Sequence, residues 1–319
     1  MPLLTVDNLR TYYFTQRGAI RAVDGVSFTV DKGQSLGIAG ESGCGKSTVA
    51  LSLMRLIKGG RVVEGSIILD GLSLLEMPQR EFNHVRWRKI SLVPQAAMGA
   101  LNPVYRIGDQ IVEAIRAHVR VSKPEAWARA GELLRQVEID PSRARNYPHE
   151  LSGGMCQRAM IAMALALNPD LVIADEPTTA LDVVTQAQVL KLLRRLQRGL
   201  NLSVIFISHD LSTLAQASDR IAIMYAGKTV EIGDTLALLR QPQHPYTRAL
   251  LGSFPDIKST GRRISALPGS PPDLVAPPSG CRFHPRCPAV LGICTIKEPA
   301  MTEVLPRHYV ACHLPSSKG

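Results

Sequence analysis

The sequence predicts an α/β fold built on a parallel β-sheet, and three neighbouring segments carry that prediction. Two uninterrupted apolar runs, Leu171–Ala174 and Val204–Ile207, are typical of strands buried on both faces of a parallel sheet. Between them, residues 183–200 place apolar side chains at helical spacing and basic side chains on the opposite side. A strand, a helix and a second strand in this order form the unit from which parallel sheets are assembled.

The N-terminal part of the chain is expected to form strands followed by one helix. Apolar and polar residues alternate over residues 26–30, and a short apolar run, Ser35–Ala39, ends at Gly40. The pattern then changes to helical spacing over residues 46–57.

The remainder of the chain divides into a helical middle, a hairpin and a different C-terminal part. Helices are expected to dominate residues 105–165, and residues 221–232 to form a hairpin that turns at Gly227-Lys228. Five prolines then occur among residues 268–278, and four of the six cysteines follow them. We therefore expect two domains, residues 1–238 and residues 239–319, with a proline-rich linker inside the second.

Composition limits the classes of protein to consider. The 319 residues are 45% hydrophobic and 20% charged, which excludes a disordered chain, and their net charge is +10. That charge suits a nucleotide or an anionic membrane surface, whereas nucleic-acid binding is not expected because aromatic residues are not interleaved with the basic ones. The longest apolar run, Ala159–Leu167, is shorter than the roughly 20 residues of a spanning helix. The N-terminus lacks the pattern of a secretory signal, so we expect a cytosolic chain with reduced thiols.

A phosphate-binding loop is predicted between the strand that ends at Gly40 and the helix that follows. The segment matches G-x-x-x-x-G-K-[ST], and its residues are Gly40, Glu41, Ser42, Gly43, Cys44, Gly45, Lys46, Ser47 and Thr48. Its glycines let backbone N–H groups turn toward phosphate oxygens, beside the positive end of the helix dipole. We expect Lys46 to reach the β- and γ-phosphates of ATP and Ser47 to ligate Mg²⁺. The same helix terminus is expected to lower the pKa of the Cys44 thiol.

Two acidic residues, Asp175 and Glu176, follow the buried apolar run 171–174. A carboxylate at the tip of a buried strand is the expected second support for Mg²⁺ beside a phosphate loop. The adjacent glutamate is expected to polarise the water that attacks the terminal phosphate.

A second anion-binding pattern, Leu151–Met155 (LSGGM), opens a predicted helix. With this segment the chain resembles the ATPase subunits of ABC transporters, whose signature loop it matches. Over residues 1–238 the resemblance includes Gln95 in the Q-loop, Ala180-Leu181-Asp182 in the D-loop, His209 as the switch histidine and Tyr13 as the aromatic residue that stacks on adenine. It implies a P-loop NTPase core with an antiparallel β subdomain and an α-helical subdomain at about residues 96–165.

The resemblance implies a head-to-tail dimer of ATPase domains that holds two ATP molecules. Ser152, Gly153 and Gly154 would complete the partner's nucleotide site, and Asp182 would also contribute to nucleotide binding. Glu176 and His209 would act in hydrolysis. Gln95 would contact Mg²⁺ and the attacking water while its loop meets a membrane subunit. Two departures from the family, Cys156 and Ala96-Ala97, concern docking to that subunit rather than the phosphate or metal contacts.

The C-terminal part resembles a narrower group within this family. His244-Pro245-Tyr246, Gly280–Pro288 and Leu101-Asn102-Pro103 match the DppD/OppD-like ATPases of dipeptide, oligopeptide and nickel importers. The resemblance implies a peptide-importer ATPase at the cytoplasmic face of the cell membrane. Its partners would be two membrane-spanning permease subunits, a second, paralogous ATPase and an extracytoplasmic substrate-binding protein. A nickel or oligosaccharide importer is the alternative, and a non-transport ABC ATPase or a redox protein is a more distant one.

Four cysteines near the C-terminus form a candidate metal site. They are Cys281, Cys287, Cys294 and Cys312, with 5, 6 and 17 residues between successive members. Four thiolates can hold a metal in a segment that is too short to build a hydrophobic core. Zinc sites usually show closer cysteine pairs, and the looser spacing here accommodates a [4Fe–4S] cluster. The resemblance implies such a cluster, with zinc as the alternative. His284, His308 and His313 are either spare ligands or surface residues.

Overall fold

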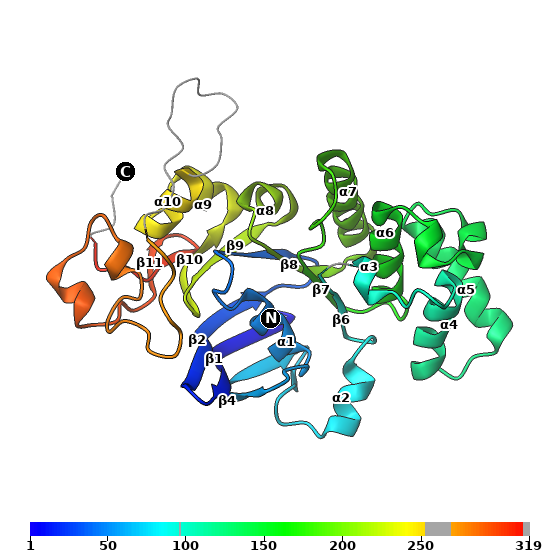
Figure 1. Ribbon diagram of the computed structural model, residues 1–319, viewed down its shortest axis with the longest axis horizontal. Helices are drawn as coiled ribbons and strands as arrows, with labels where there is room; N and C mark the ends of the chain where they lie inside the picture. Colours follow the sequence, from blue (N-terminus) through cyan, green and yellow to red (C-terminus); the bar gives the residue numbers. More distant parts are fainter. Residues whose placement is uncertain (96, 253–268, 315–319) are drawn as a thin grey trace. The chain divides into compact units, whose positions relative to one another are not determined.

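The computed structural model describes residues 1–95, 97–252 and 269–314 (Figure 1). The chain divides into two compact units. The first unit comprises residues 1–2, 30–35 and 73–207, and the second comprises residues 3–29, 36–72 and the described part of 208–319. Among the described residues, every helix is too short or too polar to cross a lipid bilayer.

The first unit contains the predicted buried parallel strands. Strands β6 (Ile90–Val93), β7 (Leu171–Asp175) and β8 (Ser203–Ser208) pair in parallel, with Ile90 opposite Leu171 and Leu171 opposite Ser203. All five residues of β7 are buried. Because these strands are covered on both faces, β7 and β8 contain the uninterrupted apolar runs 171–174 and 204–207. The prediction of buried parallel strands is confirmed.

Most of the first unit is helical, as the sequence predicted for residues 105–165. Its helices are α2 (Gln79–Val85), α3 (Ala97–Ala100), α4 (Ile107–His118), α5 (Lys123–Gln136), α6 (Gly153–Ala164) and α7 (Val183–Leu200), with 3-10 turns at η1 (Pro141–Arg145) and η2 (Pro148–Glu150). Helices α4, α5 and α6 pack against one another, and they lie together in Figure 1. The described helical region begins at Ala97, since Ala96, the first residue of the expected 96–165 subdomain, lies outside the described residues.

Helix α7 has the bounds that the sequence predicted. The side chain of Asp182 accepts a hydrogen bond from the backbone N–H of Thr185 and caps its first turn. The helix ends at Asn201, whose positive φ of 50° is the left-handed conformation that closes many helices. Its apolar positions Val189, Leu193 and Leu196 are buried, so packing of this face accounts for the helical spacing of the sequence.

The second unit begins with an antiparallel sheet of order β2-β1-β4-β5. Its strands are β1 (Leu4–Thr15), β2 (Gly18–Val30), β4 (Gly60–Leu69) and β5 (Leu72–Ser73), the last lying where the chain passes into the first unit. In the β1–β4 pair, Leu4 lies opposite Leu69. This sheet is the expected antiparallel β subdomain.

The same unit holds a second set of strands, and the C-terminal residues add to it. Strand β3 (Ser35–Ala39) runs parallel to β9 (Arg220–Tyr225), which forms a hairpin with β10 (Lys228–Asp234). Strand β12 (His308–Val310) pairs antiparallel with β10, and β11 (Thr302–Leu305) pairs with β12. The C-terminal strands therefore extend the sheet of the phosphate-loop strand instead of forming a separate sheet.

The helices of the second unit are short. They are α1 (Lys46–Leu53), α8 (Leu211–Ala217), α9 (Thr235–Arg240) and α10 (Pro245–Gly252), with 3-10 turns η3 (His284–Arg286) and η4 (Gly292–Thr295). Helix α1 ends earlier than the predicted 46–57 because Arg55 adopts a positive φ of 50°. The hairpin turn falls on Ala226-Gly227 rather than Gly227-Lys228, since these two residues adopt the positive φ values of a tight hairpin turn. Part of the proline-rich segment, including Pro268, lies outside the described residues.

Candidate nucleotide site

The phosphate loop joins β3 to α1, and its backbone path depends on glycine. Gly45 has a φ of +104°, and a Cβ atom there would lie 2.0 Å from the carbonyl oxygen of Ala22. A Cβ on Gly40 would lie 2.2 Å from the carbonyl oxygen of Met224. At Gly43, by contrast, no atom lies within 4 Å of where a Cβ would stand. The loop is therefore pressed against its own unit at both ends and open at its tip, which suits a phosphate cradle.

Lys46 lies inside this loop. Its side chain is buried, and its ammonium donates hydrogen bonds to the carbonyl oxygens of Gly40 at 2.7 Å and Glu41 at 3.0 Å. The charge is thus held at the first turn of α1, where the backbone N–H groups have no helical partners. Lysine and helix terminus together provide the positive potential that a nucleotide phosphate requires.

The prediction for Cys44 was wrong in sign. Burial raises the pKa of the Cys44 thiol, and the nearby Lys46 ammonium only partly offsets that effect. Cys44 is only 5% exposed. Desolvation of the thiolate therefore outweighs the helix terminus.

Two further predicted residues lie in the second unit. Tyr13 on β1 is half-buried, and its hydroxyl lies 3.5 Å from Oγ1 of Thr48, so the predicted adenine-stacking ring stands beside the start of α1. His209 follows β8 and is exposed. Its neighbour Asp210 caps α8 by accepting hydrogen bonds from the N–H of Ser212 and the hydroxyl of Thr213. That cap fixes the loop from which His209 projects.

Two predicted catalytic residues meet in the first unit. Gln95 Nε2 donates a hydrogen bond to Oε2 of Glu176 at 2.9 Å, and the Thr179 hydroxyl donates to the same oxygen at 2.8 Å. Glu176 has a positive φ of 45°, and its N–H donates to the carbonyl oxygen of Ile207. The preceding Asp175 ends β7 and is 8% exposed. Two adjacent carboxylates, Asp175 and Glu176, therefore stand at the end of β7, and two neutral donors orient the carboxylate of Glu176.

The signature segment and the D-loop residue also meet in the first unit. Ser152 caps α6, since its hydroxyl accepts a hydrogen bond from the N–H of Met155. Gly154 is buried, and a Cβ there would lie 2.5 Å from Cγ2 of Thr185. Thr185 in turn donates from its hydroxyl to Asp182 at 2.6 Å. The hydrogen bonds from Thr185 hold the pKa of Asp182 below its usual value. Gly153, half-buried, begins α6 between these contacts.

The departure at Cys156 has a structural place. Its side chain is fully buried in α6, with the sulfur 3.4 Å from the carbonyl oxygen of Pro148. It does not reach the helix N-terminus where an anion would bind. The other departure, Ala96-Ala97, begins outside the described residues.

The structure does not support the expected four-cysteine metal site. All six cysteines are free thiols, and the N–H of Cys281 donates to the carbonyl oxygen of Cys294. Burial raises the pKa of Cys281 to about 11, and the thiols of Cys287, Cys294 and Cys312 contribute to the same shift. Within residues 1–95, 97–252 and 269–314, no three His, Cys, Asp or Glu side chains converge closely enough to hold an ion. His308 is neither a spare ligand nor a surface residue, because it is buried against Glu231.

Two residues that the sequence analysis did not select contact the phosphate loop. Arg286 pairs with the carboxylate of Glu41, and the hydroxyl of Tyr246 accepts a hydrogen bond from the N–H of Glu41. Tyr246 belongs to the His-Pro-Tyr motif, and Arg286 stands between two of the C-terminal cysteines. Arg286 could have been selected from the sequence, because it is a charged residue inside a short segment rich in cysteine and proline.

Comparison with known proteins decides the family. A probable peptide ABC transporter ATP-binding protein of Sinorhizobium fredii is 48% identical over 97% of this chain and 94% of its own length. The dipeptide transport ATP-binding protein DppD of Bacillus subtilis is 44% identical over 99% of this chain and 96% of its own. The chain belongs to the ATP-binding subunits of dipeptide/oligopeptide ABC transporters. It is therefore an ABC transporter ATPase.

Family models and a solved structure agree with this family. The model described as ABC transporter matches residues 23–179, and the model described as oligopeptide/dipeptide transporter, C-terminal region, matches residues 230–294. A dimeric ATP-binding cassette in a post-hydrolysis state with ADP and Pi is 29% identical, with a TM-score of 0.66 over 73% of this chain and 98% of that chain. The ABC ATPase α/β fold with an antiparallel β subdomain is thus confirmed.

Proposed function

We propose that this ABC transporter ATPase energises the import of dipeptides or oligopeptides. The curated relatives support this substrate class through their names, and the match over residues 230–294 supports it through the C-terminal region. In this proposal residues 1–238 are the ATPase domain and residues 239–319 are the importer-specific C-terminal domain. The chain works at the cytoplasmic face of the membrane as a peripheral subunit.

The observation that carries the chemistry is the hydrogen bond from Gln95 to Glu176. We assign Glu176 as the base that takes a proton from water as the water oxygen attacks the γ-phosphorus and the bond to the β-phosphate oxygen breaks. Gln95 and Thr179 hold its carboxylate in place. His209 contributes a second polar group to this step.

The phosphate loop binds the nucleotide in this proposal. Lys46 neutralises the β- and γ-phosphates, Ser42 to Thr48 surround them with backbone N–H groups, and Tyr13 stacks on adenine. Ser47, Gln95 and Asp175 supply the oxygen donors that Mg²⁺ prefers. When bound, the ion would screen the phosphate charge.

A second ATPase subunit is the proposed partner of the signature segment. Ser152, Gly153 and Gly154 stand at the N-terminus of α6, and Asp182 is fixed beside them through Thr185. The backbone N–H groups at a helix N-terminus suit the phosphates of a nucleotide bound by a neighbouring cassette. The similar solved cassette is a dimer. We infer a paralogous second subunit, alongside an extracytoplasmic binding protein.

The proposed docking surface for the two permease subunits is a groove of about 650 Å³ in the first unit. Trp87, Tyr105, Gln110 and His118 line it together with small residues of α3 and α4. Gln110 organises its rim, since it accepts from the N–H of Asn102 and donates to the carbonyl oxygens of Asn102 and Tyr105. Val104 and Tyr105 are 71% and 55% exposed, as expected of residues that a partner covers.

We retain a [4Fe–4S] cluster at the four C-terminal cysteines as a proposal, with zinc as its alternative. The four free thiols and their spacing support it, although their placement in the structure does not. Anaerobic purification followed by iron and zinc analysis tests it on the wild type and Cys287→Ser. About four irons per chain, lost in the variant, would establish the cluster. Absence of both metals would remove the proposal without affecting the ATPase assignment.

Transport by the reconstituted complex tests the proposed function. The chain is purified with its co-expressed permeases and second ATPase, placed in vesicles and supplied with binding protein and labelled dipeptide. ATP-dependent dipeptide uptake is the expected result, and uptake of Ni²⁺ or an oligosaccharide without dipeptide uptake would overturn the substrate class.

The docking groove is tested in the same reconstituted complex. Gln110→Ala should weaken the binding protein's stimulation of ATP hydrolysis while basal hydrolysis persists. If the binding protein stimulates ATP hydrolysis equally in the wild type and in Gln110→Ala, the groove is not the docking surface.

A further inference from the structure

Arg286 forms a two-point ion pair with the phosphate loop. Its Nη1 donates to Oε2 of Glu41 at 2.7 Å, and its Nη2 donates to Oε1 at 3.0 Å. The Arg286 side chain is 5% exposed, and its Nη1 also lies 3.3 Å from the hydroxyl of Tyr225. A planar guanidinium that meets both carboxylate oxygens fixes the direction as well as the charge of its partner.

Tyr246 holds the backbone of the same loop residue. Its hydroxyl accepts a hydrogen bond from the N–H of Glu41 at 2.9 Å. The side chain is fully buried, and its ring packs against the rings of Tyr225 and Phe283. Since the carbonyl oxygen of Glu41 accepts from Lys46, every polar part of Glu41 is engaged within this unit.

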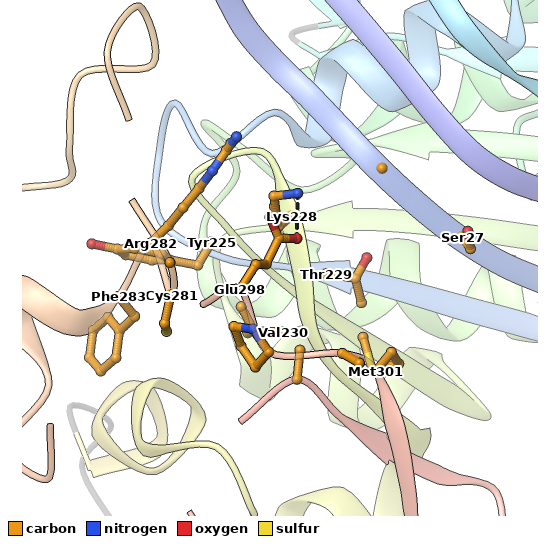
Figure 2. Close-up of a pocket in the computed structure, with 15 residues that line it drawn as sticks. Ser27, Tyr225, Lys228, Thr229, Val230, Cys281, Arg282, Phe283, Glu298 and Met301 are labelled. Carbon is orange, nitrogen blue, oxygen red and sulfur yellow. Dashed lines mark ion pairs between the residues drawn. The ribbon is translucent and has the colours of Figure 1, made fainter. Parts of the chain in front are cut away.

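A second arginine of the same short segment anchors it nearby. Arg282 donates to the buried carboxylate of Asp24 and to the carbonyl oxygen of Ala226. The next residue, Gly227, donates its N–H to the carbonyl oxygen of Cys44 in the phosphate loop at 2.9 Å. Figure 2 shows the side chain of Arg282 beside Tyr225. Both residues line a cavity of about 210 Å³, together with Lys228 and Glu298.

The charge of Glu41 makes its pairing important for nucleotide binding. A carboxylate in the second position of the loop repels the phosphates that the loop has to hold, and partial burial strengthens that repulsion. Arg286 neutralises this charge and fixes the position of the carboxylate through both of its oxygens. We propose that Arg286 and Tyr246 are positioning residues for ATP binding, so that the C-terminal region forms part of the support of the phosphate loop.

The proposal rests on ATP binding by the phosphate loop, and it does not depend on which solute is transported. It differs from a general stabilising role in one respect, because it predicts opposite consequences for the two members of the ion pair. Loss of Arg286 leaves an unpaired negative charge beside the phosphates. Loss of the Glu41 charge leaves a positive one.

Equilibrium binding of MgATP to the purified chain is the test. Arg286→Gln should raise the Kd about tenfold, whereas Glu41→Gln should lower the Kd because it removes the charge that repels the phosphates. The double variant Glu41→Gln/Arg286→Gln should recover most of the affinity that Arg286→Gln loses. Arg17→Gln is the matched control, since Arg17 pairs with Asp273 in the C-terminal region while both side chains are exposed.

Three further readouts separate positioning from folding. The melting temperature of each variant shows whether it is folded, and in the reconstituted complex the KM for ATP should rise in Arg286→Gln with kcat changed less than about twofold. If Arg286→Gln does not fold, the Kd of Glu41→Gln decides, and a value raised tenfold overturns the proposal. An unchanged Kd in folded Arg286→Gln, or a double variant as weak as the single one, also overturns it. Transport of a solute other than peptide would leave each of these results unaffected.

Discussion

Gln95 and Glu176 are joined by a hydrogen bond of 2.9 Å although 81 positions separate them in the sequence. The contact places an amide from the end of β6 against the carboxylate that follows β7. It joins two residues whose catalytic roles the sequence suggested separately. A neutral amide donor orients the carboxylate without cancelling its charge, which leaves it able to accept a proton.

Glu176→Gln should bind MgATP with a Kd within about threefold of the wild type and lose at least about 100-fold in hydrolysis rate. The amide keeps the shape of the side chain but accepts no proton at neutral pH. Nucleotide binding and phosphate release measured on the same preparation check both parts. Thr179→Val is the comparison, because it removes only one donor to the same oxygen and should cost less. Hydrolysis at the wild-type rate in Glu176→Gln would remove this residue as the base.

Gly45→Ala should abolish MgATP binding and lower the melting temperature. The added methyl group would meet the carbonyl oxygen of Ala22 at 2.0 Å, so either the loop or β2 has to move. Gly43→Ala provides the matched control, since no atom lies near its Cβ position and only the positive φ of +79° is unfavourable, at about 1 kcal/mol. Equal losses of MgATP affinity and melting temperature in the two variants would contradict this expectation. They would show that the positive φ, and not the close approach of the Ala22 carbonyl oxygen, is why the loop requires glycine.

The parts of this fold that the sequence predicted well are those in which local pattern and tertiary packing agree. The β7 run is apolar throughout because both of its faces are covered, and α7 has a capping Asp182 and a left-handed Asn201 at its two ends. The phosphate loop was also recognised locally, since the G-x-x-x-x-G-K-[ST] pattern lies within the consecutive residues 40–47. Each of these signals lies within a few residues.

The features that escaped prediction depend on contacts between distant parts of the chain. Arg286 and Tyr246 reach Glu41 across 245 and 205 positions, and no periodicity in the sequence records which basic residue meets which carboxylate. Burial of the Cys44 thiol raises its pKa, so the local argument from a helix terminus predicted the wrong direction. Burial is a property of the whole unit, and short motifs do not encode it.

His244 should make stability depend on pH between about 6.5 and 4. Burial lowers the pKa of His244 to about 4, although the nearby Glu231 carboxylate opposes that shift. The unfolded chain therefore takes up a proton near pH 6.5 and the folded chain only near pH 4. Folding stability from this group is complete above pH 6.5 and declines as the pH falls, by at most about 1.4 kcal/mol per pH unit.

Urea denaturation at several pH values checks this expectation. In the wild type the N–H of Tyr246 donates a hydrogen bond to Nδ1 of His244. His244→Asn keeps an acceptor for this N–H and removes the titrating imidazole. The difference in unfolding free energy between the wild type and this variant should decrease from pH 6.5 to pH 4. A difference that stays constant over this range would mean that His244 titrates alike in the folded and unfolded chains.

Cys44 should react with iodoacetamide more slowly in the folded chain than in the urea-unfolded chain, by at least about tenfold at pH 8. Its thiol is buried, and its pKa is raised, so both access and the thiolate fraction are reduced. Peptide mass spectrometry after timed alkylation measures the rate at each cysteine. Cys312 is the internal comparison, because it is half-buried and should react sooner, although burial also raises its pKa. Faster labelling of Cys44 than of Cys312 would mean that the terminus of α1 activates the Cys44 thiol. It would also mean that the loop opens more readily than its contacts with Ala22, Met224 and Arg286 predict.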